Sequence, residues 1–225
     1  YAFPGVPGLI GGRTNHVAFG VTNAYGDVQD LYAETVNSAN NNEYKNNNNW
    51  LTFEHEQHTF NVKDSATETG YRTETVPYRK TIHGIVASDL GLFDDKLPGE
   101  VISLRWALDE GNRGGIGVIN MMLAKDVFEF DKALAEFDTV MFNFVFGDTK
   151  GNIGHRSTGR IPIRSDKNGA YLRDGATAGN HWQGWIPKDE MPGQFNPAKG
   201  WVGTANNHTR TDDYPYYYSS GFAPS

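Results

Sequence analysis

The sequence predicts a mixed fold of strands and helices, and three stretches carry that prediction. Residues 50–88 are rich in β-branched and aromatic side chains that alternate with polar ones or run apolar, as strands do. Residues 116–137 are rich in helix formers, with apolar residues three and four positions apart. Residues 139–164 indicate two strands joined by a turn at DTKGN. Since no repeat or linker separates these stretches, we expect one mixed unit of α and β structure.

The other elements are predicted from similar signals. Residues 16–23 (HVAFGVTN) indicate a buried strand that ends in small polar residues, and residues 97–108 a further strand. Residues 27–36 begin with two acids and predict either a short helix or an irregular turn. Residues 38–49 are polar and of low complexity, which is typical of an exposed loop. The last third is rich in Gly, Trp and Pro and predicts long ordered loops, with a strand at residues 200–207.

Composition excludes several classes of function. The chain has 225 residues, a formal net charge of −7 and no cysteine, so disulfides, thiol catalysis and Cys-based zinc sites are excluded. Lys and Arg are scattered, so we expect no nucleic-acid partner. No apolar run is long enough to predict a membrane span. Because the chain begins at Tyr1 within a Pro/Gly-rich turn and ends at Ser225 without a closing element, we expect a piece of a longer protein.

Two acids three positions apart, Asp27 and Asp30, are candidate metal ligands. Two carboxylates with a backbone carbonyl between them can converge on one hard cation. They can equally cap a helix that begins near Val28, where acids favour the helix dipole. The spacing by itself favours the cap.

Asparagines follow two of the predicted strands, Asn23 after the first and Asn206 and Asn207 after the last. A carboxamide beside a free backbone N–H can hold a developing oxyanion, although Asn is also common in turns. No serine lies in the strand–turn–helix elbow of a Ser-His-Asp hydrolase. His83, at the end of a predicted strand, fits a structural role better than that of a base.

The order of several stretches is more informative than any of them alone. They are PGVPGLIGGRTNHVAFGVTNAYGDVQDLYAE, YRKTIHG, VISLRWA, GDTKGNIGHRSTGRIPIR, WQGWIP, FNPAKGWVGTANN and DDYPYY. Together they resemble the β-chain of the penicillin amidase family, which includes penicillin, cephalosporin and acyl-homoserine-lactone acylases. The resemblance implies an α+β fold, the four-layer αββα fold of N-terminal-nucleophile hydrolases. Residues 1–225 would be one segment of the β-chain, without the nucleophile region.

The resemblance implies hydrolysis of a small N-acyl amide substrate. Family members use the free N-terminal Ser of the β-chain as nucleophile and its α-amino group as base. That Ser would precede Tyr1, which has no aliphatic hydroxyl or thiol, so the nucleophile would lie outside this chain. The implied partners are the other chains of the same autocatalytically processed precursor, the α-chain and the rest of the β-chain. The implied location is the periplasm or the exterior of the cell, and the implied role is in antibiotic metabolism.

The resemblance also assigns site residues. The backbone oxyanion donor falls on Asn23 and the carboxamide donor on Asn206, with Asn207 as the alternative. The positions that line the acyl pocket fall on Val21, Tyr25 and Phe142.

A structural calcium ion is implied as well. Its ligands fall on Asp27, the backbone carbonyl of Gln29, and Asp30, which reverses the preference for a helix cap. A further carboxylate that some members supply would fall near Tyr218, whose phenol cannot bind calcium in that way.

Two other readings remain at this point. The chain could be a catalytically inactive family member or a processed remnant that serves as a binding or structural module. It could also be an unrelated carbohydrate-binding protein whose pocket contains Trp182, Trp185 and Trp201. A Ser, Thr or Cys at a cleavage junction upstream would favour the enzyme.

Overall fold

The computed structural model describes residues 2, 4–93, 99–111, 113–138 and 141–219. It divides into two compact units, where the sequence predicts a single one. The first unit comprises Tyr1–Val28, Ala107–Gly169 and Trp182–Ser225, and the second comprises Gln29–Trp106 and Ala170–His181. The boundaries between the units follow Val28, Trp106, Gly169 and His181, and no linker of distinctive composition marks them. The sequence pattern therefore does not reveal the division.

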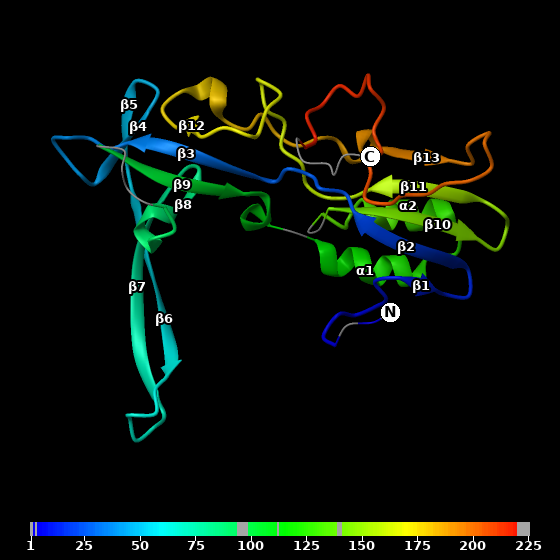
Figure 1. Cartoon of the computed structure of the whole chain (residues 1–225), viewed down its shortest axis with the longest axis horizontal. Coiled ribbons are helices and arrows are strands. Elements are labelled where there is room, and N and C mark those ends of the chain that lie inside the picture. Colours follow the sequence, from blue (N-terminus) through cyan, green and yellow to red (C-terminus); the bar gives the residue numbers. More distant parts are fainter. Residues whose placement is uncertain (1, 3, 94–98, 112, 139–140, 220–225) are drawn as a thin grey trace. The chain divides into compact units, whose positions relative to one another are not determined.

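The first unit contains a five-stranded sheet in the order β1-β2-β10-β11-β13, and all neighbouring strands are antiparallel (Figure 1). The β10–β11 hairpin predicted within residues 139–164 is confirmed, with its turn at residues 149–152. The strands of this sheet are β1 (Gly12–Arg13), β2 (Val17–Asn23), β10 (Phe142–Asp148), β11 (Ile153–Ser157) and β13 (Gly193–Phe195).

Two helices cover one face of this sheet and form the main core with it. They are α1 (Gly114–Leu123) and α2 (Val127–Leu134), which confirms the predicted helical region. The side chain of Asp126 begins α2 by accepting hydrogen bonds from the N–H groups of Phe128 and Glu129. Alternate residues of β10 point to opposite faces. Three residues of β10 and three of β2 pack against the helices on the same face of the sheet. They are Phe142, Phe144 and Phe146 of β10, and Val17, Phe19 and Val21 of β2.

The second unit contains a six-stranded sheet in the order β12-β3-β9-β8-β7-β6, antiparallel except for the β12–β3 pair. The long β6–β7 hairpin extends from it (Figure 1). The strands are β3 (Gln29–Thr35), β6 (Glu54–Lys63), β7 (Tyr71–Thr81), β8 (Gly84–Val86), β9 (Glu100–Trp106) and β12 (Arg173–Asp174), with a separate pair β4 (Glu43–Asn46) and β5 (Asn49–Thr52). Short 3₁₀ turns lie at Ala87–Leu90, Ala107–Glu110, Ala178–Asn180 and Lys188–Glu190 across the two units.

The segment at residues 27–36 corrects one prediction. It forms strand β3, neither a helix nor an irregular turn, so the helix-cap reading of Asp27 and Asp30 is wrong. Alternate residues of this strand, Asp30, Tyr32 and Glu34, are buried. Their period of two is that of a strand, and pairing with β9 along its whole length stabilises it.

Two further segments differ from their predictions. The polar stretch at residues 38–49 contains β4 and the start of β5, because Tyr44 is buried against Phe53 and anchors the hairpin. Residues 200–207 form no regular strand, since local hydrogen bonds and a left-handed residue there replace sheet pairing. Of the strand predicted at residues 97–108, the part at Glu100–Trp106 is confirmed, and residues 97 and 98 lie outside the described residues.

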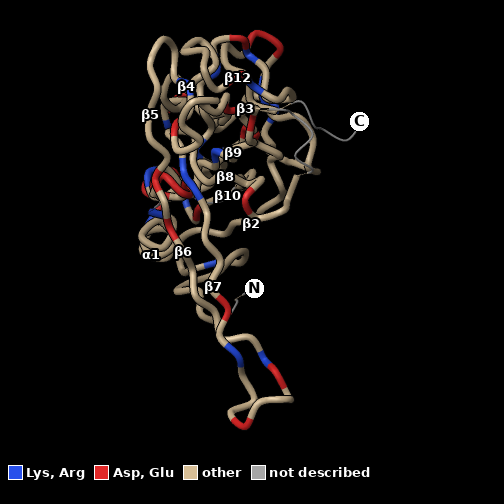
Figure 2. Tube along the Cα trace, turned by 90° about the vertical axis from the view of Figure 1, so that its left-hand side faces the viewer, with Lys and Arg blue, Asp and Glu red and all other residues tan. Residues whose placement is uncertain are grey.

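Charge is mixed along the trace. Lys and Arg are interspersed with Asp and Glu, including on the β6–β7 hairpin (Figure 2). In the part of the chain that the structure describes, no helix is long and apolar enough to cross a bilayer.

Candidate functional site

The two predicted oxyanion residues meet at the end of β2. The backbone N–H of Asn23 donates a hydrogen bond to Oδ1 of Asn206, at 2.9 Å, although the residues are 183 positions apart. Strand β1 pairs only with Ala18 and Phe19 of β2, so the outer edge of β2 at Asn23 has no strand partner among the described residues. This open edge leaves the Asn23 N–H available to a side chain or a ligand.

The backbone distinguishes Asn206 from its neighbour. Asn206 has a φ of 61°, the left-handed conformation that Asn tolerates better than most residues, and its side chain reaches β2. Asn207 is engaged locally, because its Oδ1 accepts from the N–H of Ala205 and its Nδ2 donates to the carbonyl of His208, each at 2.9 Å. The geometry thus supports Asn206, and not the alternative Asn207, as the residue that faces the end of β2.

The side chain of Asn23 has the turn role that its residue type favours. Its Oδ1 accepts a hydrogen bond from the N–H of Tyr25 at 2.8 Å, across a turn in which Tyr25 has a φ of 51°. This Asx-type turn ends β2 and turns the chain away from the sheet. The Asn23 carboxamide therefore shapes the turn while its backbone N–H faces Asn206.

Polar side chains behind this pair were missed by sequence reasoning. Asn143 of β10 is fully buried, and its Oδ1 accepts from the hydroxyl of Ser157 at 2.6 Å. The hydroxyls of Thr22 and Thr204 are 2.9 Å apart. A signal was present, since Asn143 interrupts an otherwise apolar strand, MFNFVF. A single buried polar residue does not reveal its distant partners.

His155 lies beside Asn143 in the same buried group. Its Nε2 is 3.4 Å from Asn143 Oδ1, so the neutral ring donates there through Nε2. Burial, aided by the nearby cations Arg156 and Lys199, lowers the pKa of His155 from 6.5 to about 4. Because the unfolded chain binds the proton more readily than the folded chain, this group destabilises the fold as the pH falls from 6.5 towards 4.

Replacing His155 is therefore expected to flatten the dependence of stability on pH. In the full-length protein, His155→Gln keeps an amide donor but does not titrate. The wild-type slope should exceed that of the variant by up to about 1.4 kcal/mol per pH unit between pH 6 and 4.5. Thermal unfolding at half-unit pH steps measures it. Parallel curves for the two proteins would show that His155 does not take up a proton on unfolding.

The predicted acyl-pocket residues lie near the pair but in different environments. Val21 and Phe142 are partly buried and pack on the helix-facing core, whereas 39% of Tyr25 is exposed. Phe142 is the register partner of Asn23. Val21 also lines an apolar hollow of about 560 Å³ together with Ala2, Ile10, Gly11, Gly12, Phe19 and Gly20.

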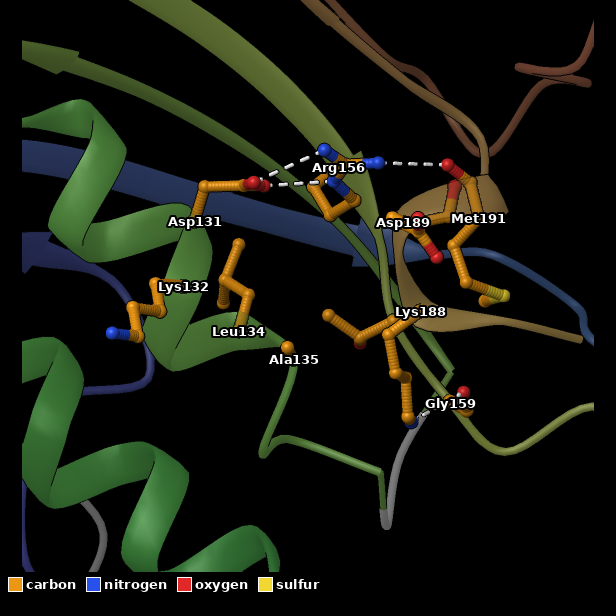
Figure 3. Close-up of a pocket in the computed structure, with 11 residues that line it drawn as sticks. Asp131, Lys132, Leu134, Ala135, Arg156, Gly159, Lys188, Asp189 and Met191 are labelled. Carbon is orange, nitrogen blue, oxygen red and sulfur yellow. Dashed lines mark hydrogen bonds and ion pairs between the residues drawn. The ribbon is translucent and has the colours of Figure 1, made fainter.

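A second cavity, of about 270 Å³, lies between α2, β11 and the turn around residue 189 (Figure 3). Arg156 forms a bidentate ion pair with Asp131 at 2.7 and 3.0 Å and donates to the carbonyl of Met191. Lys188 donates to the carbonyl of Gly159, and burial lowers its pKa. Protein groups therefore already bind Arg156 and Lys188 in the lining of this cavity.

The proposed calcium ligands are already paired with buried arginines. In the first unit, Asp27 is 3.2 Å from Arg164 and accepts from the hydroxyl of Tyr217. In the second unit, Asp30 is 3.4 Å from Arg173, and both side chains are buried. No group of three or more His, Cys, Asp or Glu side chains suited to a metal occurs among the described residues. Neither carboxylate therefore requires a cation to balance its charge, and calcium binding stays a prediction.

His83 is buried in the second unit. Its Nδ1 is 2.8 Å from Oε1 of Glu34, and its ring stacks on Tyr32 at 3.8 Å between centroids. The same Glu34 oxygen accepts from Thr81 and Ser103. Burial lowers the pKa of His83. With 1% of its surface exposed, His83 is buried, which agrees with the structural role that its position at a strand end favours.

The comparison with known families decides what this chain is. The penicillin amidase family model matches residues 1–225. The chain belongs to the penicillin amidase family. This membership excludes the unrelated carbohydrate-binding protein, and the tryptophans agree, because Trp182 is 9% exposed and packs edge-on against Trp185, while Trp201 is 59% exposed.

Curated members of the penicillin amidase family align with nearly the whole chain. It is 30% identical to penicillin acylase 2 proenzyme from Pseudomonas sp. strain SE83, over 98% of this chain and 27% of that protein. It is 29% identical to acyl-homoserine lactone acylase QuiP from Pseudomonas aeruginosa, over 93% of this chain and 25% of that protein. The chain therefore spans about a quarter of the length of these relatives.

The fold is that of a solved acylase. Thermostable penicillin G acylase from Alcaligenes faecalis matches 99% of this chain and 38% of its own, with a TM-score of 0.79 and 23% sequence identity. This likeness confirms the predicted α+β fold.

Proposed function

We propose that this chain supplies the oxyanion-binding part of an enzyme that hydrolyses N-acyl amides. The observation that carries the proposal is the hydrogen bond between the Asn23 N–H and the Asn206 side chain. It places a backbone donor and a carboxamide at one point on an open sheet edge. The relatives are penicillin acylases and acyl-homoserine lactone acylases, enzymes whose shared chemistry is cleavage of an N-acyl bond.

In the proposed mechanism, the Ser Oγ of a chain N-terminus outside residues 1–225 attacks the amide carbonyl, and its α-amino group takes the proton. The carbonyl oxygen becomes an oxyanion. Asn23 N–H and Asn206 Nδ2–H donate to it, and hydrogen bonds aimed at the developing charge lower the barrier. The amine leaves with a proton, and water then hydrolyses the acyl ester to release the acid.

The Asn206 carboxamide must turn for both groups to donate. Its Oδ1 faces the Asn23 N–H, which satisfies that N–H in the structure. For Asn23 N–H and Asn206 Nδ2 to bind the same oxygen, the carboxamide rotates so that its nitrogen faces the substrate. Asn206 is exposed, so packing does not prevent this rotation.

Four further features belong to the same proposal. The acyl group would lie against Val21, Phe142 and the exposed ring of Tyr25, beside the apolar hollow that Val21 lines. The nucleophile would come from the remainder of a processed precursor, which would also bind this chain. A periplasmic or secreted location is proposed from the family alone. A structural calcium ion near Asp27, Gln29 and Asp30 is proposed on the same basis.

Amine release from the full-length gene product tests the function. Penicillin G and N-acyl-homoserine lactones of short and long chain serve as substrates, and fluorescamine detects the primary amine that is released. Intact mass and N-terminal sequencing identify the processed chains. We expect a new N-terminal Ser, and its replacement by Ala should abolish both processing and hydrolysis.

The opposite result has a clear meaning. If the precursor is not cleaved to a free N-terminal Ser, Thr or Cys and releases no amine from any of these substrates, the enzyme proposal is wrong. The alternative of an inactive family member that serves as a binding or structural module then stands.

A further inference from the structure

The most connected buried side chain near the candidate oxyanion site is Asn143. It lies on β10, between Thr22 of β2 and Ser157 of β11 in the strand register. Its neighbours Phe142 and Phe144 pack on the helix core, so Asn143 points to the face of the sheet opposite the helices. The segment that carries Asn206 lies on this opposite face, because Thr204 and Thr209 both contact Asn143.

The Asn143 carboxamide is bonded on both of its ends. Its Nδ2 donates to the carbonyl oxygen of Asn23 and to the hydroxyl of Thr204, both at 3.4 Å. Its Oδ1 accepts from Ser157 at 2.6 Å, Thr209 at 3.3 Å and His155 at 3.4 Å. One buried group therefore connects the residue that supplies the backbone donor with positions on either side of Asn206.

We propose that Asn143 is the positioning residue of the oxyanion site: it fixes the end of β2 and the 204–209 segment relative to each other. Asn206 itself is exposed and left-handed, so little packing holds it. Its segment is fixed by the hydroxyls of Thr204 and Thr209 instead. The hydroxyl of Thr204 forms hydrogen bonds with Thr22, at 2.9 Å, and with Asn143. Thr204 therefore also links β2 to the segment that carries Asn206.

This arrangement matters because the stabilisation of an oxyanion falls sharply as the distance between donor and oxygen increases. A displacement of about 1 Å in a positioned group can cost about 100-fold in rate. Asn143 does not touch the reacting atoms, so its loss should affect the transition state through the placement of Asn206. The inference rests on the proposed function, because it assumes that Asn23 and Asn206 bind the oxyanion.

The test uses the full-length processed protein and measures kcat and KM for amine release from its best substrate. We expect Asn143→Ala to lower kcat by about 10- to 100-fold with KM nearly unchanged, since only the transition state loses stabilisation. Thr204→Val, a smaller change that removes one hydroxyl, should lower kcat in the same direction. Asn152→Ala is the matched control. It also removes a carboxamide from the β10–β11 hairpin, but that carboxamide donates to Asp148 at the turn. Its kcat should stay at the wild-type value.

A double-mutant cycle separates positioning from a general structural effect. If Asn143 acts through Asn206, Asn143→Ala combined with Asn206→Ala should be no slower than Asn206→Ala alone, within about threefold. If the two fold-losses in kcat multiply in the double variant, the inference is wrong. It is also wrong if both Asn143→Ala and Thr204→Val keep the wild-type kcat. If Asn143→Ala does not fold, Thr204→Val and its own cycle with Asn206→Ala decide. Wild-type kcat in Asn206→Ala would refute the proposed oxyanion site itself, which is a different failure.

Discussion

Asn206→Ala is expected to leave the processed enzyme folded and able to bind substrate, yet nearly inactive. A donor to an oxyanion forms a stronger hydrogen bond in the tetrahedral intermediate than in the ground state, so its loss lowers kcat. Removal of one such donor costs about 2.7–4 kcal/mol, a rate loss of about 100- to 1,000-fold. Steady-state kinetics of amine release measure the effect, with thermal unfolding as the check on folding.

Two neighbouring substitutions are its controls. Asn207→Ala should be much milder, because the Asn207 side chain bonds only Ala205 and His208 in its own turn. Asn23→Ala should also be milder than Asn206→Ala, since the backbone N–H remains, although it loses the bond that holds Tyr25. If Asn207→Ala loses most of its kcat while Asn206→Ala keeps a normal kcat, the carboxamide donor is Asn207 and not Asn206. Normal kcat in both would refute the assignment.

Asp30→Ala is expected to lower the stability of the second unit strongly. Asp30 and Arg173 are both buried, with side-chain exposures of 0% and 3%. Removal of the carboxylate breaks this buried ion pair, and removing one partner of such a pair costs about 3–5 kcal/mol. Thermal or denaturant unfolding of the full-length protein measures the change. A midpoint equal to that of the wild type would show that the pair does not stabilise the fold.

A double substitution and a chelator separate charge pairing from calcium binding. If the cost comes from loss of the ion pair, Asp30→Ala combined with Arg173→Met should recover part of the lost stability, since an apolar side chain replaces the buried charge. If the segment binds calcium, a chelator should lower the wild-type midpoint, and Asp30→Ala should remove that response. A wild-type midpoint that ignores the chelator, with no calcium found by metal analysis, would refute the calcium site.

The sequence by itself determined the local elements with strong periodicity and the family. The strand at residues 16–23, the helices within residues 116–137 and the β10–β11 hairpin follow from side-chain patterns that act over a few residues. The ordered blocks from PGVPGLIGG to DDYPYY identified the penicillin amidase family, which the family comparison confirmed.

Tertiary structure decided what depends on partners far along the chain. Residues 27–36 carry acids that resemble a helix start, yet pairing with β9 makes them a strand, because the ladder outweighs local preference. Tyr44 gives a polar stretch a buried anchor, which local composition hides. The contact of Asn23 with Asn206 spans 183 positions, and the bonds of Asn143 reach three separate segments. No local pattern encodes such contacts, because they form only when the completed sheet brings those segments together.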